Sequence, residues 1–214
     1  MRRVIDPSTW EPPEPPPSRG DGRIRGTLYG SRLYDQPEHA ALADAVRAFC
    51  QPGPPLSLEI GVDRGYRILG HARRWTEQRW LGVELRRTVR DAAEHAPRNC
   101  MLLRGDIRAV LAAGLIGAHR LKRVDILFPT PSNNPGHLLL TPAVVALLAE
   151  SLEADGVLLF ATDVPGMARL AERLLARWPR VEEPPSGPVL SRREKVCARD
   201  GLTVWRWACR PPPN

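Results

Sequence analysis

Short apolar runs alternate with helix-like segments between residues 37 and 210, and this alternation restricts the possible folds more than any other feature. The apolar runs predict strands at 56–60, 80–83, 100–103, 124–128, 156–161 and 204–208. The segments between them predict helices at 38–50, 64–75, 86–95, 106–113, 141–152 and 165–177. Such an order is typical of βαβ units. We therefore predict an α/β fold with a mostly parallel central sheet and helices on both faces.

The two ends of the chain differ from this folded part. Residues 1–20 contain six prolines, which cannot donate ladder hydrogen bonds and favour extended geometry. We predict a disordered Pro/Arg-rich arm over 1–22, a single domain over 23–210 and a Pro-rich tail over 211–214. The arm leads into arginines interleaved with Tyr29 and Tyr34. This stretch is either a solvated leader or a segment that touches RNA phosphate.

The charge balance favours nucleic acid as a partner. Lysine and arginine number 31 against 24 acidic residues, which gives a formal net charge of +7. No apolar run approaches the ~18 residues of a membrane span, and none follows the first arginines as a signal peptide requires, so we expect a cytoplasmic protein. The four cysteines form no C-x-x-C pair and the five histidines show no ligand spacing. We therefore expect no metal and no disulfide scaffold.

Glycines and acidic residues follow the first three predicted strands, where parallel sheets bind ligands. Glu59, Gly61 and Gly65 come at or after the first strand, Glu84 ends the second, and Asp106 follows the third. Glycine lets the backbone approach a ligand, and an acid about 20 residues later can bind ribose hydroxyls. No phosphate-binding lysine accompanies them, so S-adenosylmethionine fits best. Taken singly, the glycines are also explained as turn residues, Glu84 as a solvated strand end and Asp106 as a helix cap.

Six segments in one order resemble the bacterial tRNA (guanine-N7-)-methyltransferases. The most specific are 126–129 (Ile-Leu-Phe-Pro) and 161–163 (Ala-Thr-Asp). The others are 58–61, 81–84, 104–106 and 191–194, and the resemblance covers about residues 24–210. It implies a Rossmann-like class I methyltransferase fold, S-adenosylmethionine as methyl donor, and a guanine of the tRNA variable loop as acceptor.

The resemblance also implies roles for residues at matching positions. The donor site would comprise Glu59, Gly61, Gly65, Glu84 and Asp106. Asp163 would contact the target guanine, and Ser191, Arg192, Arg193 and Glu194 match a Thr-x-x-Glu segment that would close over the site. Asp163 and Glu194 would also stabilise the charge that develops on the methylated purine. As alternatives, Asp163 caps the following helix and Glu194 lies on a solvated loop.

The chain departs from the family pattern at several places, and one of them is Ser132, which stands at the position of the tryptophan in Phe-Pro-Asp-Pro-Trp. Asp63 stands at the middle glycine of Gly-x-Gly-x-Gly, Thr130 replaces the aspartate of Phe-Pro-Asp-Pro-Trp, and Asn134 occupies the position of a substrate-binding lysine in a basic run that is missing here. Guanine N7 has a lone pair and no proton at neutral pH, so its alkylation needs alignment rather than a general base. Thr130 can still offer its hydroxyl and carbonyl to the donor.

We therefore expect methyl transfer from S-adenosylmethionine to N7 of a tRNA guanosine, by a monomer or a homodimer. Two alternatives stay open. A methyltransferase for a small purine-like acceptor would suit the missing basic run. A non-catalytic RNA-binding relative would suit Asp63 and Thr130.

Overall fold

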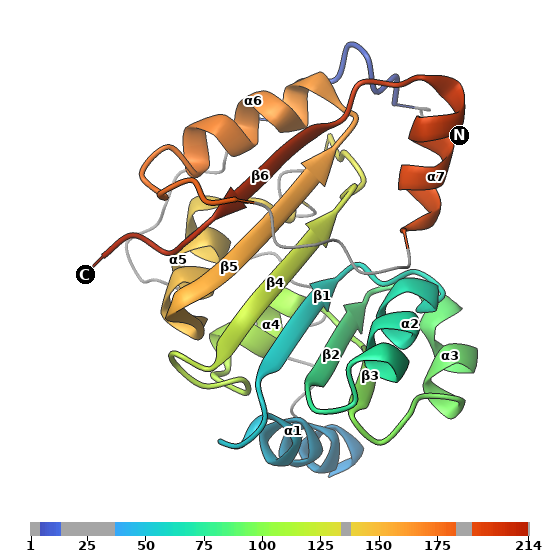
Figure 1. The fold of residues 1–214 in the computed structure, drawn as a ribbon, viewed down its shortest axis with the longest axis vertical. Helices are drawn as coiled ribbons and strands as arrows, with labels where there is room; N and C mark the ends of the chain where they lie inside the picture. The colour runs from blue at the N-terminus through green and yellow to red at the C-terminus, as the bar shows by residue number, and fades with distance from the viewer. Residues whose placement is uncertain (1–4, 14–36, 134–137, 183–189, 214) are drawn as a thin grey trace.

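Strands form one sheet at the centre of the computed structural model, which describes residues 5–13, 37–133, 138–182 and 190–213 (Figure 1). Within these residues the sheet has six strands in the order β3-β2-β1-β4-β5-β6. Strands β1 to β5 are parallel to their neighbours, and β6 is antiparallel to β5. The bounds are β1 Leu56–Ile60, β2 Arg79–Glu84, β3 Cys100–Arg104, β4 Leu121–Leu127, β5 Leu152–Thr162 and β6 Trp205–Cys209. The predicted α/β fold with a mostly parallel sheet is confirmed.

Helices connect the parallel strands and cover both faces of the sheet. In Figure 1, α2 lies in front of the strands and α4 and α5 lie behind them. The bounds are α1 Pro37–Cys50, α2 Tyr66–Arg74, the 3-10 turn η1 Arg87–Val89, α3 Arg90–Glu94, α4 Ile107–Ala112, α5 Pro142–Ser151, α6 Pro165–Leu174 and α7 Arg192–Asp200. Helix α5 begins with Pro142 after its cap Thr141, whose Oγ1 accepts a hydrogen bond from Val144 N at 3.3 Å. In the described part of the chain, no helix has the length and apolar character needed to cross a membrane.

The core lies between the sheet and these helices. All five residues of β1 are buried, as expected for a central parallel strand that is covered on both faces. Trp80 and Trp207 are 1% and 6% exposed, so both belong to the core. The Trp207 ring packs edge-on against Phe160 with centroids 5.6 Å apart.

Strand β5 begins earlier than predicted, at Leu152 rather than at residue 156. Its first part is acidic, and Lys122 Nζ pairs with Glu153 and Asp155 at 3.0 and 2.7 Å. Gly156 permits a close approach here, because a Cβ at this position would lie 2.7 Å from the carbonyl oxygen of Leu121. A polar stretch with a glycine carries no apolar alternation, so the hydrophobic pattern does not reveal this part of the strand.

Helix α7 was not predicted, although its start carries a known signal. Ser191 Oγ accepts from Glu194 N at 3.1 Å, and Glu194 Oε2 accepts from Ser191 N at 2.7 Å, which is a capping box. At the other end Gly201 adopts the left-handed conformation, with φ 63°. Only its two capping motifs mark this polar helix in the sequence.

The expected disordered arm is wrong for residues 5–13, because Trp10 is 4% exposed and belongs to the core. A Cβ on Gly166 would lie only 2.0 Å from the carbonyl oxygen of Trp10, so the segment runs directly against α6. Glu11 also forms an ion pair with Arg169 of α6. Residues 14–22 of the arm, and the basic stretch with Tyr29 and Tyr34, lie outside the described residues.

Candidate active site

A cavity of about 740 Å³ lies beyond the carboxyl ends of the parallel strands. The strand order reverses between β1 and β4, and open α/β sheets bind ligands at such a point. Most of the predicted site residues line this cavity: Glu59, Gly61, Glu84, Asp106, Thr130, Asp163, Ser191, Arg192 and Arg193. Gly65 and Glu194 are not among the lining residues, and Asn134 lies outside the described part of the chain.

The loop after β1 has a backbone shape that exposes it to the cavity. Gly61 has φ 82°, and a Cβ at this position would meet no atom within 4 Å, so the space beside it is open to a ligand. Asp63 also adopts the left-handed conformation, with φ 50°. Aspartate tolerates this conformation better than most residues, which explains how it can stand where the family has glycine.

Glu84 at the end of β2 joins the loops on two sides of the cavity. Its Oε2 accepts a hydrogen bond from Asp63 N and its Oε1 accepts one from Arg86 N, both at 2.9 Å. A carboxylate has about four acceptor positions, so each oxygen can accept another hydrogen bond. Its position at the cavity therefore suits a ribose diol, and the interpretation as a solvated strand end does not hold, since Glu84 is 8% exposed.

Asp106 is both a helix cap and a cavity residue. Its Oδ1 accepts from Arg108 N at 2.9 Å, which caps α4, and its Oδ2 lies 2.7 Å from Arg108 Nη2. The side chain is 2% exposed, yet the residue lines the cavity. Capping and contact with a ligand are compatible at this position.

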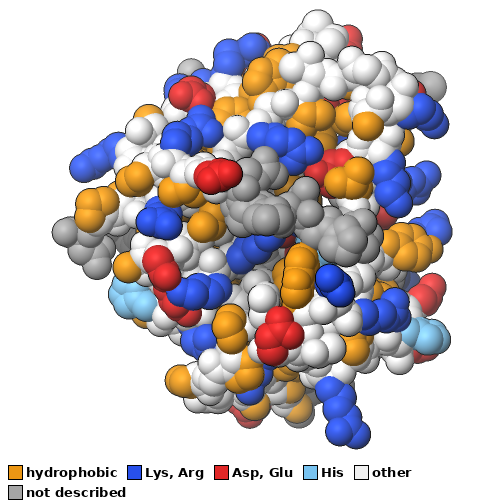
Figure 2. Space-filling view, in the orientation of Figure 1, with side chains coloured by type: hydrophobic (Ala, Val, Ile, Leu, Met, Phe, Trp, Pro, Cys, Tyr) orange, Lys and Arg blue, Asp and Glu red, His pale blue; other side chains and the backbone are white. Residues whose placement is uncertain are grey.

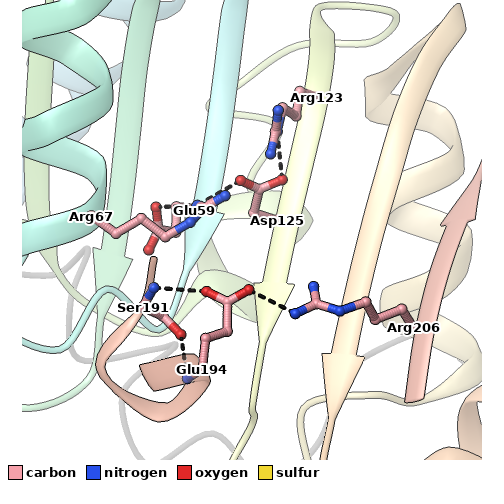
Figure 3. A network of polar contacts seen from close by, with 7 residues as sticks. All are labelled: Glu59, Arg67, Arg123, Asp125, Ser191, Glu194 and Arg206. Atoms are coloured by element: carbon pink, nitrogen blue, oxygen red, sulfur yellow. Dashed lines mark hydrogen bonds and ion pairs between the residues drawn. The ribbon is translucent and has the colours of Figure 1, made fainter. Parts of the chain in front are cut away.

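Glu59 belongs to a buried ionic cluster beneath the cavity (Figure 3). It lies opposite Asp125 on the neighbouring strand, and Arg67 Nη1 approaches Glu59 Oε2 at 2.8 Å and Asp125 Oδ2 at 2.7 Å. Arg123 Nε binds the other oxygen of Asp125 at 2.7 Å. Burial raises the pKa of Glu59 to about 7, and Arg67 only partly opposes this shift. Neither Arg67 nor Asp125 was predicted as a site residue; the only signal for them in the sequence is the charged Asp125 inside the apolar run of β4.

The ends of β4 and β5 together with α7 form another part of the cavity wall. Asp163 follows β5, and Arg193 of α7 donates to its Oδ2 from both Nε and Nη2. Phe128 adopts φ 52° at the end of β4, where its N–H bonds to Ala161 O at 2.7 Å. The chain then turns to Thr130, whose Oγ1 accepts from Arg86 Nη2 at 3.3 Å. Asp163 and Thr130 thus line the same cavity as Glu59, Glu84 and Asp106.

Gly65 has a packing role rather than contact with the cavity. It is the N-cap of α2 with φ 73°, and a Cβ would lie 3.0 Å from Ala92 Cβ and 3.2 Å from Leu102 Cδ1. The interpretation of Gly65 as a turn residue therefore describes its geometry, and direct contact with a donor does not follow from it.

Glu194 is directed away from the cavity. One carboxylate oxygen accepts from Ser191 N, and the other lies 2.9 Å from Arg206 Nη2 of β6 (Figure 3). Burial opposes ionisation, but these hydrogen bonds outweigh it and hold the pKa of Glu194 below its usual value. The predicted contact of Glu194 with guanine is not supported by this geometry. Glu194 instead fixes the start of α7, and with it Ser191, Arg192 and Arg193.

This structural role predicts different effects for two substitutions. Glu194→Gln keeps the side chain that closes the capping box, so we expect methyl transfer within about threefold of wild type. Glu194→Ala removes the cap and leaves Arg206 without this carboxylate, so we expect a loss of about 1–2 kcal/mol in stability and a larger fall in activity. Thermal unfolding and initial rates measure both effects. Equal loss of activity in the two variants would instead assign the negative charge to the reaction.

Comparisons with known proteins agree with this geometry. A family model described as "Putative methyltransferase" matches residues 54–196. The chain is 34% identical to the tRNA (guanine-N(7)-)-methyltransferase of Thermosynechococcus vestitus, over 77% of this chain and 84% of the relative. It is also 34% identical to the enzyme of that name from Anaeromyxobacter dehalogenans, over 77% and 90%.

Among solved structures, the fold is similar to a 16S rRNA (adenine(1408)-N(1))-methyltransferase variant from Catenulisporales acidiphilia with its cosubstrate SAM. The TM-score is 0.51 at 16% identity, over 80% of this chain and 93% of the other. At this identity the likeness concerns the fold alone.

Proposed function

Because this chain belongs to the family of tRNA (guanine-N(7)-)-methyltransferases, we propose that it transfers the methyl group of S-adenosylmethionine to N7 of a guanosine in tRNA. We propose that this guanosine lies in the variable loop, as the resemblance of the motifs implies. Since tRNA is the proposed acceptor, we expect the protein to act in the cytoplasm.

One observation carries the proposal: acids at the ends of three adjacent strands surround a cavity that also contains Asp163. Glu59, Glu84 and Asp106 present carboxylates where an adenosine-containing ligand needs acceptors for an ammonium group, a ribose diol and an adenine amino group. The open space beside Gly61 leaves room for that ligand. The residues present therefore fit S-adenosylmethionine.

For this reaction the protein has to align the two reactants and stabilise the positive charge that develops on the purine. The N7 lone pair forms a bond to the methyl carbon as the carbon–sulfur bond breaks, so no proton has to move before transfer. Holding the two reactants in line can supply several kcal/mol, up to roughly 7–11 kcal/mol in well-oriented systems. The purine becomes cationic, and we propose that the carboxylate of Asp163, which lines the cavity, stabilises that charge.

Exposed arginines beside the cavity suit the tRNA backbone. Figure 2 shows basic side chains along the right-hand border of this face, over α7, α2 and α3. Arg86 and Arg192 line the cavity, and Arg87 and Arg90 continue the basic surface along η1 and α3. All four are exposed. Guanidinium groups bind phosphate in a forked geometry, so this surface can hold the acceptor RNA.

We expect Arg87→Ala/Arg90→Ala to weaken tRNA binding and to lower the slope of log K against log salt by about one to two, since each lost phosphate contact removes about one. Affinity for the methyl donor should not change. The control Arg173→Ala/Arg177→Ala removes the same charge from exposed positions on and just after α6. Binding titrations at several salt concentrations measure the slope. Equal effects of the two pairs would reject a specific RNA surface beside the cavity.

A substituted acceptor tests the reacting atom. We expect labelled methyl transfer to a tRNA transcript that contains guanosine, and none when 7-deazaguanosine replaces it, because that base has carbon in place of N7. Transfer to the 7-deaza transcript would reject N7 as the acceptor.

A further inference from the structure

Arg67 differs from the exposed arginines around the cavity, because its side chain is only 6% exposed and lies between two carboxylates. Figure 3 shows its guanidinium reaching from α2 to Glu59 on β1 and Asp125 on β4. Stability alone gives little reason for such a cluster, since buried ion pairs are often no more stabilising than apolar side chains of similar volume. Arg67 and Glu59 also line the cavity, which suggests a role toward a ligand.

Both side chains keep hydrogen-bonding capacity that the described residues do not use. Arg67 makes its contacts through Nη1 and Glu59 makes its contact through Oε2, so Arg67 Nε and Nη2 and Glu59 Oε1 have no partner in the described part of the chain. None of these three atoms is among the fully buried polar atoms that lack a partner. They are therefore accessible from the cavity that both residues line.

Each carboxylate oxygen of Asp125 lies within ion-pair distance of a guanidinium, and Asp125 does not itself line the cavity. Arg123 Nε binds its Oδ1 and Arg67 Nη1 lies against its Oδ2, both at 2.7 Å. Asp125 therefore fixes the guanidinium of Arg67. Glu59 contacts the same Nη1 group, which it shares with Asp125. Burial raises the pKa of Glu59, and the positive charge of Arg67 opposes this shift only in part.

We propose that Glu59 and Arg67 together bind the amino-acid end of the methyl donor, with Glu59 accepting from the α-ammonium and Arg67 donating to the α-carboxylate. The inference rests on the proposed function. The two charges of an α-amino acid are attached to one carbon, so a protein must offer an acceptor and a donor side by side. Glu59 and Arg67 offer such a pair, since Glu59 Oε2 and Arg67 Nη1 lie 2.8 Å apart. Asp125 acts as a positioning residue for Arg67.

Donor analogues test the role of Arg67 in binding alone. Calorimetry would give Kd for S-adenosylmethionine, for its decarboxylated analogue, and for 5′-methylthioadenosine, which lacks both charged groups. The decisive quantity is the ratio of Kd for the decarboxylated analogue to Kd for S-adenosylmethionine. If Arg67 forms a hydrogen-bonded ion pair with the carboxylate, this ratio should be about 10 to 100 for the wild-type chain. In Arg67→Gln/Asp125→Asn, which removes one charge of each sign, that ratio should fall at least about tenfold.

Two further variants separate this role from folding and from general charge. Arg67→Lys keeps the positive charge but loses the fork, so the ratio should fall there as well. Arg64→Gln removes an exposed arginine that lines the same cavity and should leave the ratio unchanged. Unchanged binding of methylthioadenosine shows that the adenosine site is intact in each variant.

A wild-type ratio near one overturns the proposal without reference to any variant. An unchanged ratio in Arg67→Gln/Asp125→Asn also overturns it, and so does an equal fall in Arg64→Gln. If the wild-type chain binds none of the three ligands, the proposed function itself fails. That result is distinct from a Kd ratio near one in a chain that still binds the ligands.

Discussion

Replacing Glu84 with alanine should weaken binding of S-adenosylmethionine by at least about 100-fold. The carboxylate accepts from Asp63 N and Arg86 N and has acceptor positions left for a ribose diol. Each hydrogen bond to a charged group is worth about 1.5–3 kcal/mol, so losing two ligand bonds costs about 3–6 kcal/mol. Loss of the bonds to the two loops adds to this effect.

Calorimetric titration of the donor measures this loss, and thermal unfolding checks that the variant is folded. Glu77→Ala serves as a control, because Glu77 is an exposed glutamate just before β2. An affinity of the Glu84→Ala variant within threefold of wild type would exclude Glu84 from the donor site.

Asp163→Asn should lower the rate of methyl transfer by about 100- to 1,000-fold and leave donor affinity within about twofold. Removing one preorganised electrostatic group from an active site typically has an effect of this size. Asparagine keeps the shape of the side chain but not the charge that stabilises the cationic purine. The partner Arg193 remains in place, so α7 should keep its position.

The companion variant Arg193→Ala separates charge from positioning. It removes the guanidinium that binds Asp163 Oδ2 and retains the carboxylate. We expect a loss of about tenfold, seen mainly as weaker use of tRNA. Single-turnover rates at saturating donor distinguish the two variants. A wild-type rate in Asp163→Asn would remove Asp163 from the reaction, and equal losses would assign it only the task of holding α7.

The fold could be predicted because its strands are short apolar runs whose burial on both faces leaves a clear pattern. Strand β1 has the predicted bounds, and the first three acids lie at the strand ends where they were expected. The segment around Trp10 could not be predicted in this way, because one tryptophan among prolines has no periodicity and is buried only by contact with α6. Helix α7 was missed because it is polar and has no clear apolar periodicity, although a capping box marks its start.

The ionic contacts of the site could not be predicted from the sequence, because they form only when distant segments pack together. Arg67 occupies a helix whose other arginines are exposed, and only the packing of α2 against the sheet buries it beside Glu59 and Asp125. Glu194 matched a family motif, but Arg206 on a later strand takes one of its carboxylate oxygens. The helix that carries Arg67 and the motif that carries Glu194 could both be located in the sequence. The contacts of the two side chains could be established only from the structure.

The most direct test is to supply the protein with methyl-labelled S-adenosylmethionine and tRNA from cells that lack the modification, and then to identify the labelled nucleoside after digestion. We predict 7-methylguanosine. Labelled RNA without 7-methylguanosine, or no labelled RNA from a preparation that binds the donor, would contradict methylation of guanine N7 in tRNA and direct attention to a different acceptor.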